Sequence, residues 1–195
     1  MELIPYSRQF ISNEDIKEVS RSLKEDIITT GKYVSKFEDD LKKYFKSKFA
    51  ISTNSATAAL HLSCLALGIK KNDIVWCSSN SFVASSNSAL YCGAKIDFLD
   101  MNLNDYNLCI ESLKNKLKQT KKKYYPKVLI VTHIGGNPAD MCEIHKISKK
   151  YNFKIIEDAS HAFGSIYNNS RIGSCKYSSI CIFSFHPIKT ITTGE

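Results

Sequence analysis

The sequence lacks the features that mark several large classes of protein. Nowhere do about eighteen apolar residues run together, so we expect no transmembrane helix and no membrane partner. The first residues show no basic segment followed by an apolar one, which argues against a secretory signal peptide. Neither G-x-G-x-x-G nor a Walker lysine motif is present, so the two commonest nucleotide-binding loops are excluded.

Cysteine pairs at metal-ligand or redox spacing are also missing. The chain has 7 cysteines, an odd number, and no two of them form a C-x-x-C motif. This usage indicates reduced, buried thiols in a cytoplasmic protein, and it argues against a metal site or a disulfide framework.

Acidic residues are few relative to basic ones. The 27 lysines and arginines outnumber the 19 acidic residues, which gives a net charge of +8. Much of the excess lies in residues 114–123, where a solvated helix face followed by a loop explains it better than a phosphate-binding patch does. We therefore expect no nucleic-acid partner, although a basic surface still favours an anionic small substrate.

The chain does contain a regular alternation of strand-like and helix-like patterns. Its 195 residues are 43% hydrophobic, enough for a large core. Short apolar runs predict strands at residues 49–53, 74–77, 96–99, 128–132, 155–158 and 180–183. Because helical patterns separate most of these runs, the predicted fold is α/β, a mostly parallel sheet with helices on both faces.

Start and stop signals delimit several of the predicted helices. Ser12 can cap the first, with Asp15 three positions later approximating a capping box. Apolar residues at helical spacing from Val34 to Phe45 predict the second helix. Further helices are predicted from residue 56 to Gly68, from residue 82 to Gly93, from 110 to 117 and from 139 to 151.

Residues 54–57, Asn-Ser-Ala-Thr, form a strand-to-helix turn with small hydroxyl side chains. Such a turn exposes backbone N–H groups, and the helix dipole adds about half a positive charge there, so it can bind a phosphate. An ordinary helix N-cap explains the same residues equally well.

The last forty residues place a carboxylate and an amine at the ends of two predicted strands. Asp158 closes the run 155–158, and Lys189 follows the run 180–183 among apolar, hydroxyl and imidazole groups. A lysine there is more often a solvated rim charge, so the inference depends on the pair. Pyridoxal phosphate needs such a pair, because a lysine carries its aldehyde and an acid keeps its ring nitrogen protonated. Ligands of α/β sheets lie outside the carboxyl ends of the strands, where both groups are expected.

Three motifs carry a resemblance to a known family. They are Asn-Ser-Ala-Thr-Ala-Ala-Leu at 54–60, Glu-Asp-Ala-Ser-His-Ala at 157–162, and Phe-Ser-Phe-His-Pro-Ile-Lys-Thr-Ile-Thr-Thr-Gly-Glu at 183–195. The chain resembles the nucleotide-sugar aminotransferases of the DegT type, fold-type-I pyridoxal phosphate enzymes, in one register from Pro5 to its end. The resemblance implies a three-layer large domain like that of aspartate aminotransferase.

The resemblance also implies roles for individual residues. Lys189 would carry the cofactor and move the reacting proton, Asp158 would pair with the ring nitrogen, and His161 would bond the phenolic oxygen. Family dehydratases have histidine in place of the lysine, so Lys189 implies transamination. The implied cofactor-binding residues are Ser55, Ala56, Thr57, Phe82, Asp158, His161, Ser184 and Lys189, with Phe82 stacking on the ring and residues 55–57 and 184 holding the phosphate. The implied substrate contacts are Tyr6, Asp26, Ile27, Ile28, Thr29, Ala56 and His186.

The implied reaction moves an amino group from glutamate to the 4-keto carbon of a UDP-linked 2-acetamido-2,6-dideoxy hexose, as in pseudaminic acid biosynthesis. The implied layout is an N-terminal helix and substrate loop at 1–32 and a cofactor-binding large domain at 33–195. Relatives continue the last motif with two glycines, so we expect the chain to be truncated before the small domain. The complete protein would be a homodimer.

Two alternatives to this function stay open on the sequence. One is an inactive remnant, or a fragment that binds the cofactor or a partner without turnover. The other is an aminotransferase for another nucleotide-linked keto sugar, with TDP or GDP as the carrier.

Overall fold

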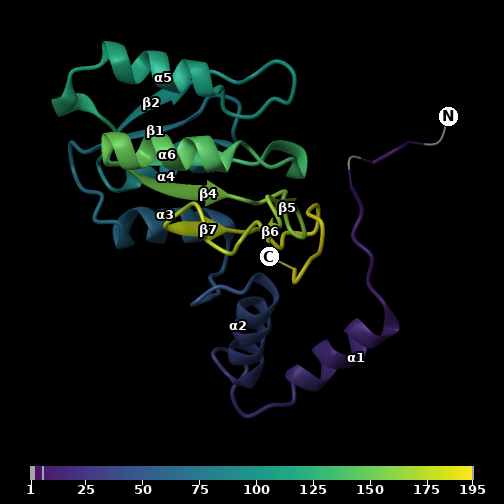
Figure 1. The fold of residues 1–195 in the computed structure, drawn as a ribbon. Helices are drawn as coiled ribbons and strands as arrows, with labels where there is room; N and C mark the ends of the chain where they lie inside the picture. Colours follow the sequence, from purple (N-terminus) through teal and green to yellow (C-terminus); the bar gives the residue numbers. More distant parts are fainter. Residues whose placement is uncertain (1–2, 6, 195) are drawn as a thin grey trace.

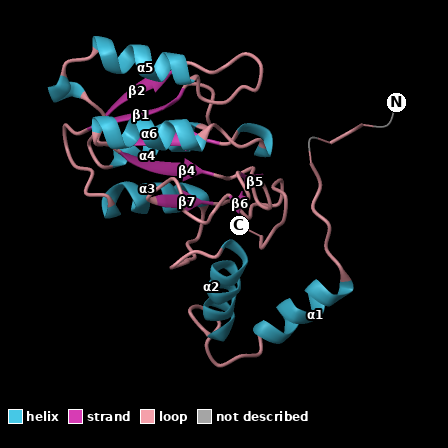
Figure 2. Ribbon diagram, in the orientation of Figure 1, coloured by secondary structure: helices cyan, strands magenta, loops and turns pink. Residues whose placement is uncertain are grey.

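The computed structural model describes residues 3–5 and 7–194. Its centre is a parallel sheet (Figures 1 and 2), and this sheet has five strands. The strands lie in the order β2-β1-β3-β4-β7, and every neighbouring pair is parallel. Their bounds are β1 Ile74–Ser78, β2 Lys95–Leu99, β3 Val128–Thr132, β4 Lys154–Asp158 and β7 Ile180–Ile182. A short antiparallel hairpin, β5 Ile166–Tyr167 and β6 Ser170–Arg171, forms a second sheet.

Helices cover both faces of the sheet, which confirms the predicted three-layer α/β fold. They are α1 Asn13–Ser22, α2 Lys32–Phe45, α3 Ala56–Ala66, α4 Val83–Tyr91, α5 Ile110–Gln119 and α6 Met141–Tyr151, with short 3-10 helices η1 Lys122–Tyr124 and η2 Ile134–Gly136. The connection through α4 steps from β1 to β2, whereas those through α5 and α6 step in the opposite direction. Because crossovers between parallel strands are right-handed, α4 lies on one face and α5 and α6 lie on the other. Within the described ranges, no helix has the length and apolar character needed to cross a membrane.

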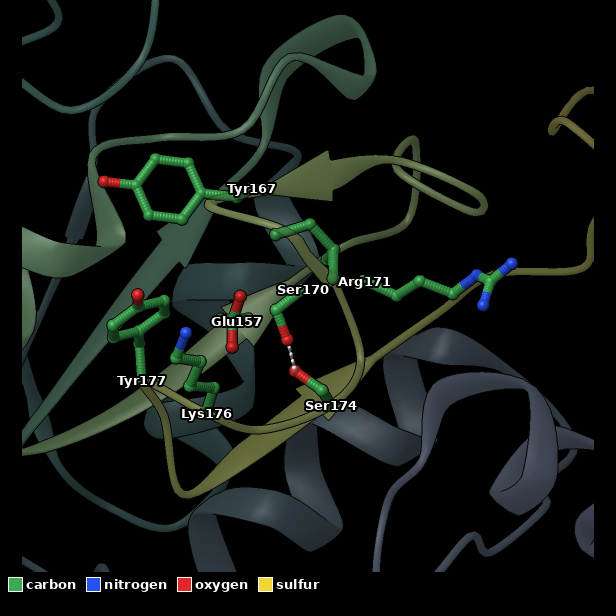
Figure 3. Close-up of a pocket in the computed structure, with 8 residues that line it drawn as sticks. Glu157, Tyr167, Ser170, Arg171, Ser174, Lys176 and Tyr177 are labelled. Carbon is green, nitrogen blue, oxygen red and sulfur yellow. Dashed lines mark hydrogen bonds between the residues drawn. The ribbon is translucent and has the colours of Figure 1, made fainter.

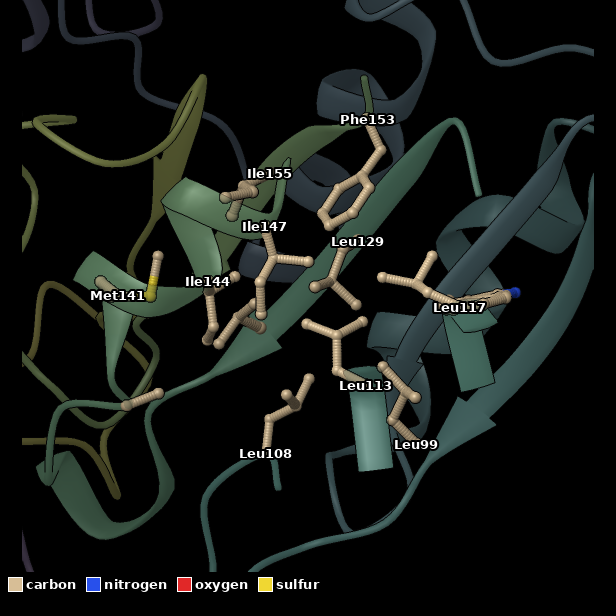
Figure 4. Close-up of a cluster of buried hydrophobic side chains, with 13 residues drawn as sticks. Leu99, Leu108, Leu113, Leu117, Leu129, Met141, Ile144, Ile147, Phe153 and Ile155 are labelled. Atoms are coloured by element: carbon tan, nitrogen blue, oxygen red, sulfur yellow. The ribbon is translucent and has the colours of Figure 1, made fainter. Parts of the chain in front are cut away.

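Two hydrophobic cores separate these layers. The first joins α5 and α6 to the sheet (Figure 4). It includes Trp76, the single tryptophan, which is 1% exposed. The second joins α3 and α4 to the other face through residues such as Leu60 and Ile130. Successive strand residues alternate between the two cores, as Leu129 and Ile130 do. Any side chain at a strand end can therefore be assigned to a face.

Several local predictions are confirmed. Ser12 caps α1, its hydroxyl accepting from the Asp15 N–H at 3.2 Å while its own N–H donates to the Asp15 carboxylate at 2.7 Å. Gly68 and Gly93 follow α3 and α4 with φ of +72° and +74°, a conformation that favours glycine.

The strand predicted at residues 49–53 is wrong, because this segment is an extended loop. No strand of the described chain lies beside it, and Phe49 and Ile51 are exposed. Its backbone bonds to a side chain instead: the Ser52 N–H and hydroxyl both donate to the Glu38 carboxylate of α2, at 2.7 and 2.8 Å. A β-branched and aromatic pattern alone does not form a strand, because a strand also needs a neighbouring strand for its backbone hydrogen bonds.

The first helix stands apart from this layered body (Figure 1). Ile16, Val19 and Leu23 recur at helical spacing and form an apolar stripe, but the stripe is exposed, and α1 buries no residue. By contrast, α2 reaches the body through Phe45 at its C-terminal end, which is buried.

Candidate active site

The candidate site lies at the carboxyl ends of β4 and β7. Figure 1 shows the hairpin β5–β6 and the C-terminal loop beyond these strand ends, on the side of α2. The chain leaves β4 at Asp158 and β7 at Ile182, and the two strands are hydrogen-bonded neighbours with these residues paired. The predicted acid and the loop that bears the predicted lysine therefore start from adjacent points.

Asp158 is held in place on both of its carboxylate oxygens. It is 2% exposed and faces α3 and α4, because its strand neighbour two positions back, Ile156, lies in the second core. The hydroxyl of Ser85 in α4 donates to Oδ2 at 2.6 Å. On the other side, the Ser160 hydroxyl and N–H donate to Oδ1 at 2.7 and 3.2 Å.

A buried hydroxyl without a bond lies beside this carboxylate. Thr132 ends β3 and is paired with Asp158 in the sheet register, so both side chains lie on the same face. It is 5% exposed, and its hydroxyl has no hydrogen-bond partner among the described residues. A buried polar atom left in this way is typical of a place where a ligand or water bonds.

His161 lies close enough to Asp158 and Lys189 for both charges to shift its pKa. Burial lowers the pKa of the His161 imidazole from its usual 6.5, the Lys189 charge lowers it further, and the Asp158 charge opposes both effects. Coulomb interactions of this kind need proximity. The Asp158 carboxylate and the Lys189 amine thus both lie near enough to the imidazole to influence its pKa, and the lowered pKa favours the neutral form of His161.

The loop that carries Lys189 is closed by its own hydrogen bonds. The Phe185 carbonyl accepts from the Thr192 hydroxyl at 2.9 Å and from the Thr193 N–H at 3.0 Å, which joins the two ends of the loop. Within it, the Lys189 N–H donates to the His186 carbonyl at 2.9 Å. Lys189 itself is half-buried. The amine is therefore presented by a folded loop.

Ser184 and His186 take part in the same loop. The His186 N–H donates to the Ser184 hydroxyl, and the Ile188 N–H donates to His186 Nδ1, both at 3.4 Å. These bonds make both predicted site residues part of the folded loop that bears Lys189. Their roles toward phosphate and substrate stay predictions.

Aromatic rings of α2 support this loop. Phe185 contacts Phe37 edge-on, with ring centroids 5.2 Å apart, and Phe163 at 5.7 Å. Below it, Phe183 stacks on Phe45 at 4.5 Å, and Tyr44 stacks on Phe163 at 5.3 Å. These six rings, the aromatic cluster, connect α2 to the loops that follow β4 and β7.

The predicted phosphate cradle lies at the same edge of the sheet. Ser55 caps α3, its hydroxyl accepting from the Ala58 N–H at 3.2 Å. The N–H groups of Ala56 and Thr57 lie in the first turn, where a helix offers no intrahelical acceptor. Because α3 leads to the amino end of β1 and packs beside β7, its N-terminus points to the carboxyl edge.

Phe82, at the N-cap of α4, is 70% exposed and free to contact a ligand.

The predicted substrate contacts are less clearly placed. Asp26, Ile27, Ile28 and Thr29 are exposed in the loop between α1 and α2, at the end of α2 away from the sheet (Figure 1). Tyr6 lies outside the described residues. The structure therefore brings together residues 158, 161 and 189 but not these.

A small pocket lies beside β4 and the hairpin β5–β6 (Figure 3). Its wall includes Glu157, which faces the opposite side of β4 from Asp158. Glu157 is buried and accepts from the Ser178 hydroxyl and from His133 Nε2, the latter at 2.9 Å. His133 Nδ1 accepts from the Ala139 N–H at 3.1 Å, so the imidazole proton resides on Nε2. With every member bonded, this network is a structural tie between β3, β4 and the loop before β7.

Sequence reasoning missed Ser85 and Ser160, the two donors to Asp158. Ser160 carried a signal, because a serine two positions after an aspartate commonly bonds it locally. Ser85 lies 73 positions from Asp158 in a serine-rich helix, and no local pattern distinguishes it.

The chain is similar to known proteins in both sequence and structure. The model of the DegT/DnrJ/EryC1/StrS aminotransferase family matches residues 9–195. The chain is 44% identical over 193 residues to a UDP-4-amino-4,6-dideoxy-N-acetyl-beta-L-altrosamine transaminase of Campylobacter jejuni subsp. jejuni strain 81-176, covering 99% of this chain and 50% of that one. It is 40% identical to the protein of the same name from strain NCTC 11168, with the same coverage of each chain. The chain thus spans about half the length of the curated relatives it matches.

Solved aminotransferase structures also match nearly all of this chain and about half of their own length. A putative sugar aminotransferase from Streptococcus pneumoniae, in its PLP form, superposes with a TM-score of 0.90 at 28% identity, over 98% of this chain and 51% of that one. Helicobacter pylori PseC, an aminotransferase involved in the biosynthesis of pseudoaminic acid, superposes with a TM-score of 0.88 at 30% identity, over 100% and 51%.

Proposed function

Because this chain belongs to the DegT/DnrJ/EryC1/StrS aminotransferase family, we propose that it is an aminotransferase that uses pyridoxal phosphate and acts on a nucleotide-linked keto sugar. One observation supports the proposal most directly: the buried Asp158 ends β4 and is paired with Ile182 at the end of β7, so the carboxylate and the loop that bears Lys189 start from the same edge of the sheet. The Streptococcus pneumoniae relative has been solved in both PLP and PMP forms.

The residues present fit this cofactor. A buried carboxylate at the end of β4 suits a protonated ring nitrogen, and an amine suits an aldehyde. The first turn of α3 and the Ser184 hydroxyl suit a phosphate, and the exposed Phe82 ring suits the flat face of a ring. The unbonded hydroxyl of Thr132 adds a polar group beside Asp158.

In the proposed reaction each side chain of the site has a separate role. When bound, pyridoxal phosphate supplies an aldehyde that accepts the amino group and a ring that takes up negative charge. Asp158 would keep the ring nitrogen protonated, so that this charge is stabilised. Lys189 would hold the aldehyde and then act as the base that moves the reacting proton. His161, neutral because of burial and the Lys189 charge, would bond the phenolic oxygen without adding a charge.

The proposed substrates are glutamate and a UDP-linked 2-acetamido-2,6-dideoxy hexose that is aminated at its 4-keto carbon. The names of the two Campylobacter jejuni relatives and of PseC support this choice. Tyr6, residues 26–29, Ala56 and His186 remain the proposed substrate contacts. A homodimer in the cytoplasm completes the proposal.

Absorbance spectroscopy tests the cofactor part of the proposal. On addition of pyridoxal phosphate the protein should gain an absorption band that Lys189→Ala lacks and that glutamate bleaches. Lys150→Ala, which changes an exposed lysine of α6, is the matched control and should keep the band. A band of equal strength in Lys189→Ala, or none in folded protein, would contradict the proposal.

A further inference from the structure

A serine of α4 makes the shortest hydrogen bond to the Asp158 carboxylate. The Ser85 hydroxyl donates to Oδ2 at 2.6 Å, against 2.7 and 3.2 Å for the two bonds from Ser160 to Oδ1. Ser85 is 0% exposed and Asp158 is 2% exposed. A charge-assisted bond between buried partners is stronger than one in water, because water does not compete for either group.

The bonds to Asp158 leave one acceptor position open. An ionised carboxylate has about four lone-pair positions, two on each oxygen. Ser160 occupies both positions of Oδ1, whereas Ser85 occupies one of the two on Oδ2. The remaining position on Oδ2 is therefore the place where one further donor can bind, and the two serines together fix the rotation of the carboxylate.

The donor is itself rigidly placed. The Ser85 N–H donates to the Phe82 carbonyl at 3.0 Å, and its carbonyl accepts from the Ser88 hydroxyl at 2.9 Å. Ala84 and Ala89 fix this part of α4 in the second core. The orientation of Asp158 is thus set by a helix packed on the sheet, not by a mobile loop.

We propose that Ser85 is a positioning residue, which turns the open acceptor position of Asp158 Oδ2 toward the ring nitrogen of bound pyridoxal phosphate. This inference rests on the proposed function. Ser85 does not touch the cofactor itself, and it acts through the direction and charge of the carboxylate.

The first test is a titration with pyridoxal phosphate, monitored by absorbance. Ser85→Ala should weaken binding about tenfold, because the carboxylate is then no longer held in the direction that accepts the ring N–H. Ser86→Ala is the matched control, because it removes a hydroxyl one position away that bonds only its own helix, donating to the Val83 carbonyl at 3.0 Å. Ser86→Ala should bind as the wild type does, and Ser85→Thr, which keeps the hydroxyl, should restore most of the affinity.

An analogue that has a carbon in place of the ring nitrogen separates positioning from a general loss of structure. It has no N–H for Asp158 to accept, so Ser85→Ala should change its affinity by no more than about twofold, the range expected for uncoupled changes. An equal loss of affinity for pyridoxal phosphate and for the analogue would overturn the proposal. So would a wild-type affinity for pyridoxal phosphate in Ser85→Ala.

A thermal double-mutant cycle in cofactor-free protein tests the contact independently. The Tm losses of Ser85→Ala and Asp158→Asn should be non-additive, with the double variant losing less than their sum. Additive losses would show that Ser85 does not hold Asp158 and would overturn the inference. If the wild type shows no Lys189-dependent band, the proposed function fails, together with the cofactor part of this inference, whereas the cycle still decides whether the serine holds the carboxylate.

Discussion

Glu157 and Asp158 are consecutive carboxylates with different environments. Glu157 is tied by Ser178 and His133 on one face of β4, where every bond connects parts of the fold. Asp158 keeps an open acceptor position on the other face, beside the unbonded hydroxyl of Thr132. The alternation of a strand thus places one acid within hydrogen bonds of the fold itself and leaves its neighbour an acceptor position for a ligand.

The shifted pKa of His161 predicts how stability depends on pH. Burial and the Lys189 charge lower the pKa in the folded state, so the unfolded chain binds more protons below the ordinary value of 6.5. The contribution of His161 to stability is therefore present above that pH and decreases as the pH falls toward the folded-state pKa. We expect the Tm to drop less between pH 7.5 and 5 in His161→Gln than in the wild type, when cofactor-free protein is heated over that pH series.

His61 supplies the control for this experiment. It is a half-buried histidine of α3 whose ring contacts Tyr91, far along the sequence from residues 158 and 189. The variant His61→Gln makes the same substitution away from residues 158 and 189, and its pH profile is the reference against which that of His161→Gln is compared. An unchanged profile in His161→Gln would show that this imidazole does not couple folding to protons.

Adjacent glycines of η2 give a second prediction at a single position. A Cβ on Gly136, where φ is +82°, would lie 2.7 Å from the His161 carbonyl oxygen, whereas one on Gly135, where φ is +60°, would meet nothing within 4 Å. Gly135→Ala should cost about 1 kcal/mol of unfolding free energy for the left-handed backbone alone. Gly136→Ala should cost about 1–3 kcal/mol more, because the backbone must move away from His161.

Urea unfolding of both glycine variants measures the difference. Since the displaced backbone belongs to His161, Gly136→Ala should also weaken pyridoxal phosphate binding, and Gly135→Ala should not. Equal stability of the two variants would mean that the loop after β3 does not press against the site.

At the level of elements, α2 supports the lysine loop through the aromatic cluster. Phe37 contacts Phe185, four positions before Lys189, and Phe45 stacks on Phe183 at the end of β7. Gly173 permits this packing, because a Cβ there would lie 2.6 Å from the Phe45 ring. The position of the amine therefore depends on a helix more than a hundred residues earlier.

Removing one ring of this cluster should loosen the loop without unfolding the sheet. Phe37→Ala is expected to cost about 2 kcal/mol, near the lower end for a large-to-small change because the ring is only half-buried. Limited proteolysis should show faster cleavage within residues 183–194, and pyridoxal phosphate should bind more weakly. Lys36→Ala, an exposed neighbour on the same helix, should behave as the wild type, and equal cleavage rates would contradict the supporting role of Phe37.

The elements that the sequence predicted well are those with a strong local signal. The continuous apolar run 128–132 became β3, and the capping pattern at Ser12 marked the start of α1. The segment 49–53 failed because its residues favour a strand but lack a neighbour, so its N–H at Ser52 turned to Glu38. The bonds of Ser85 and of the aromatic cluster join distant positions, which no local pattern reveals.

The molecule as a whole combines a tightly packed body with a first helix that makes little contact with it. Leu113 is fully buried between α5 and the sheet, whereas Val19 of α1 is exposed. Leu113→Ala should therefore reduce the unfolding free energy by about 3 kcal/mol, and Val19→Ala should change it by less than about 0.5 kcal/mol. Urea titration followed by circular dichroism measures both, and a large effect of Val19→Ala would show that α1 is packed on the body.

The position of Trp76 allows unfolding of the sheet to be followed by fluorescence. This single tryptophan lies on β1 in the first core, with the Lys116 amine 5.0 Å from its ring. An indole shielded from water emits at shorter wavelengths than an exposed one, and no second indole contributes to the signal. Fluorescence of the untagged protein should therefore stay constant while α1 moves or frays, and its emission should shift to longer wavelengths only when β1 and its neighbours come apart.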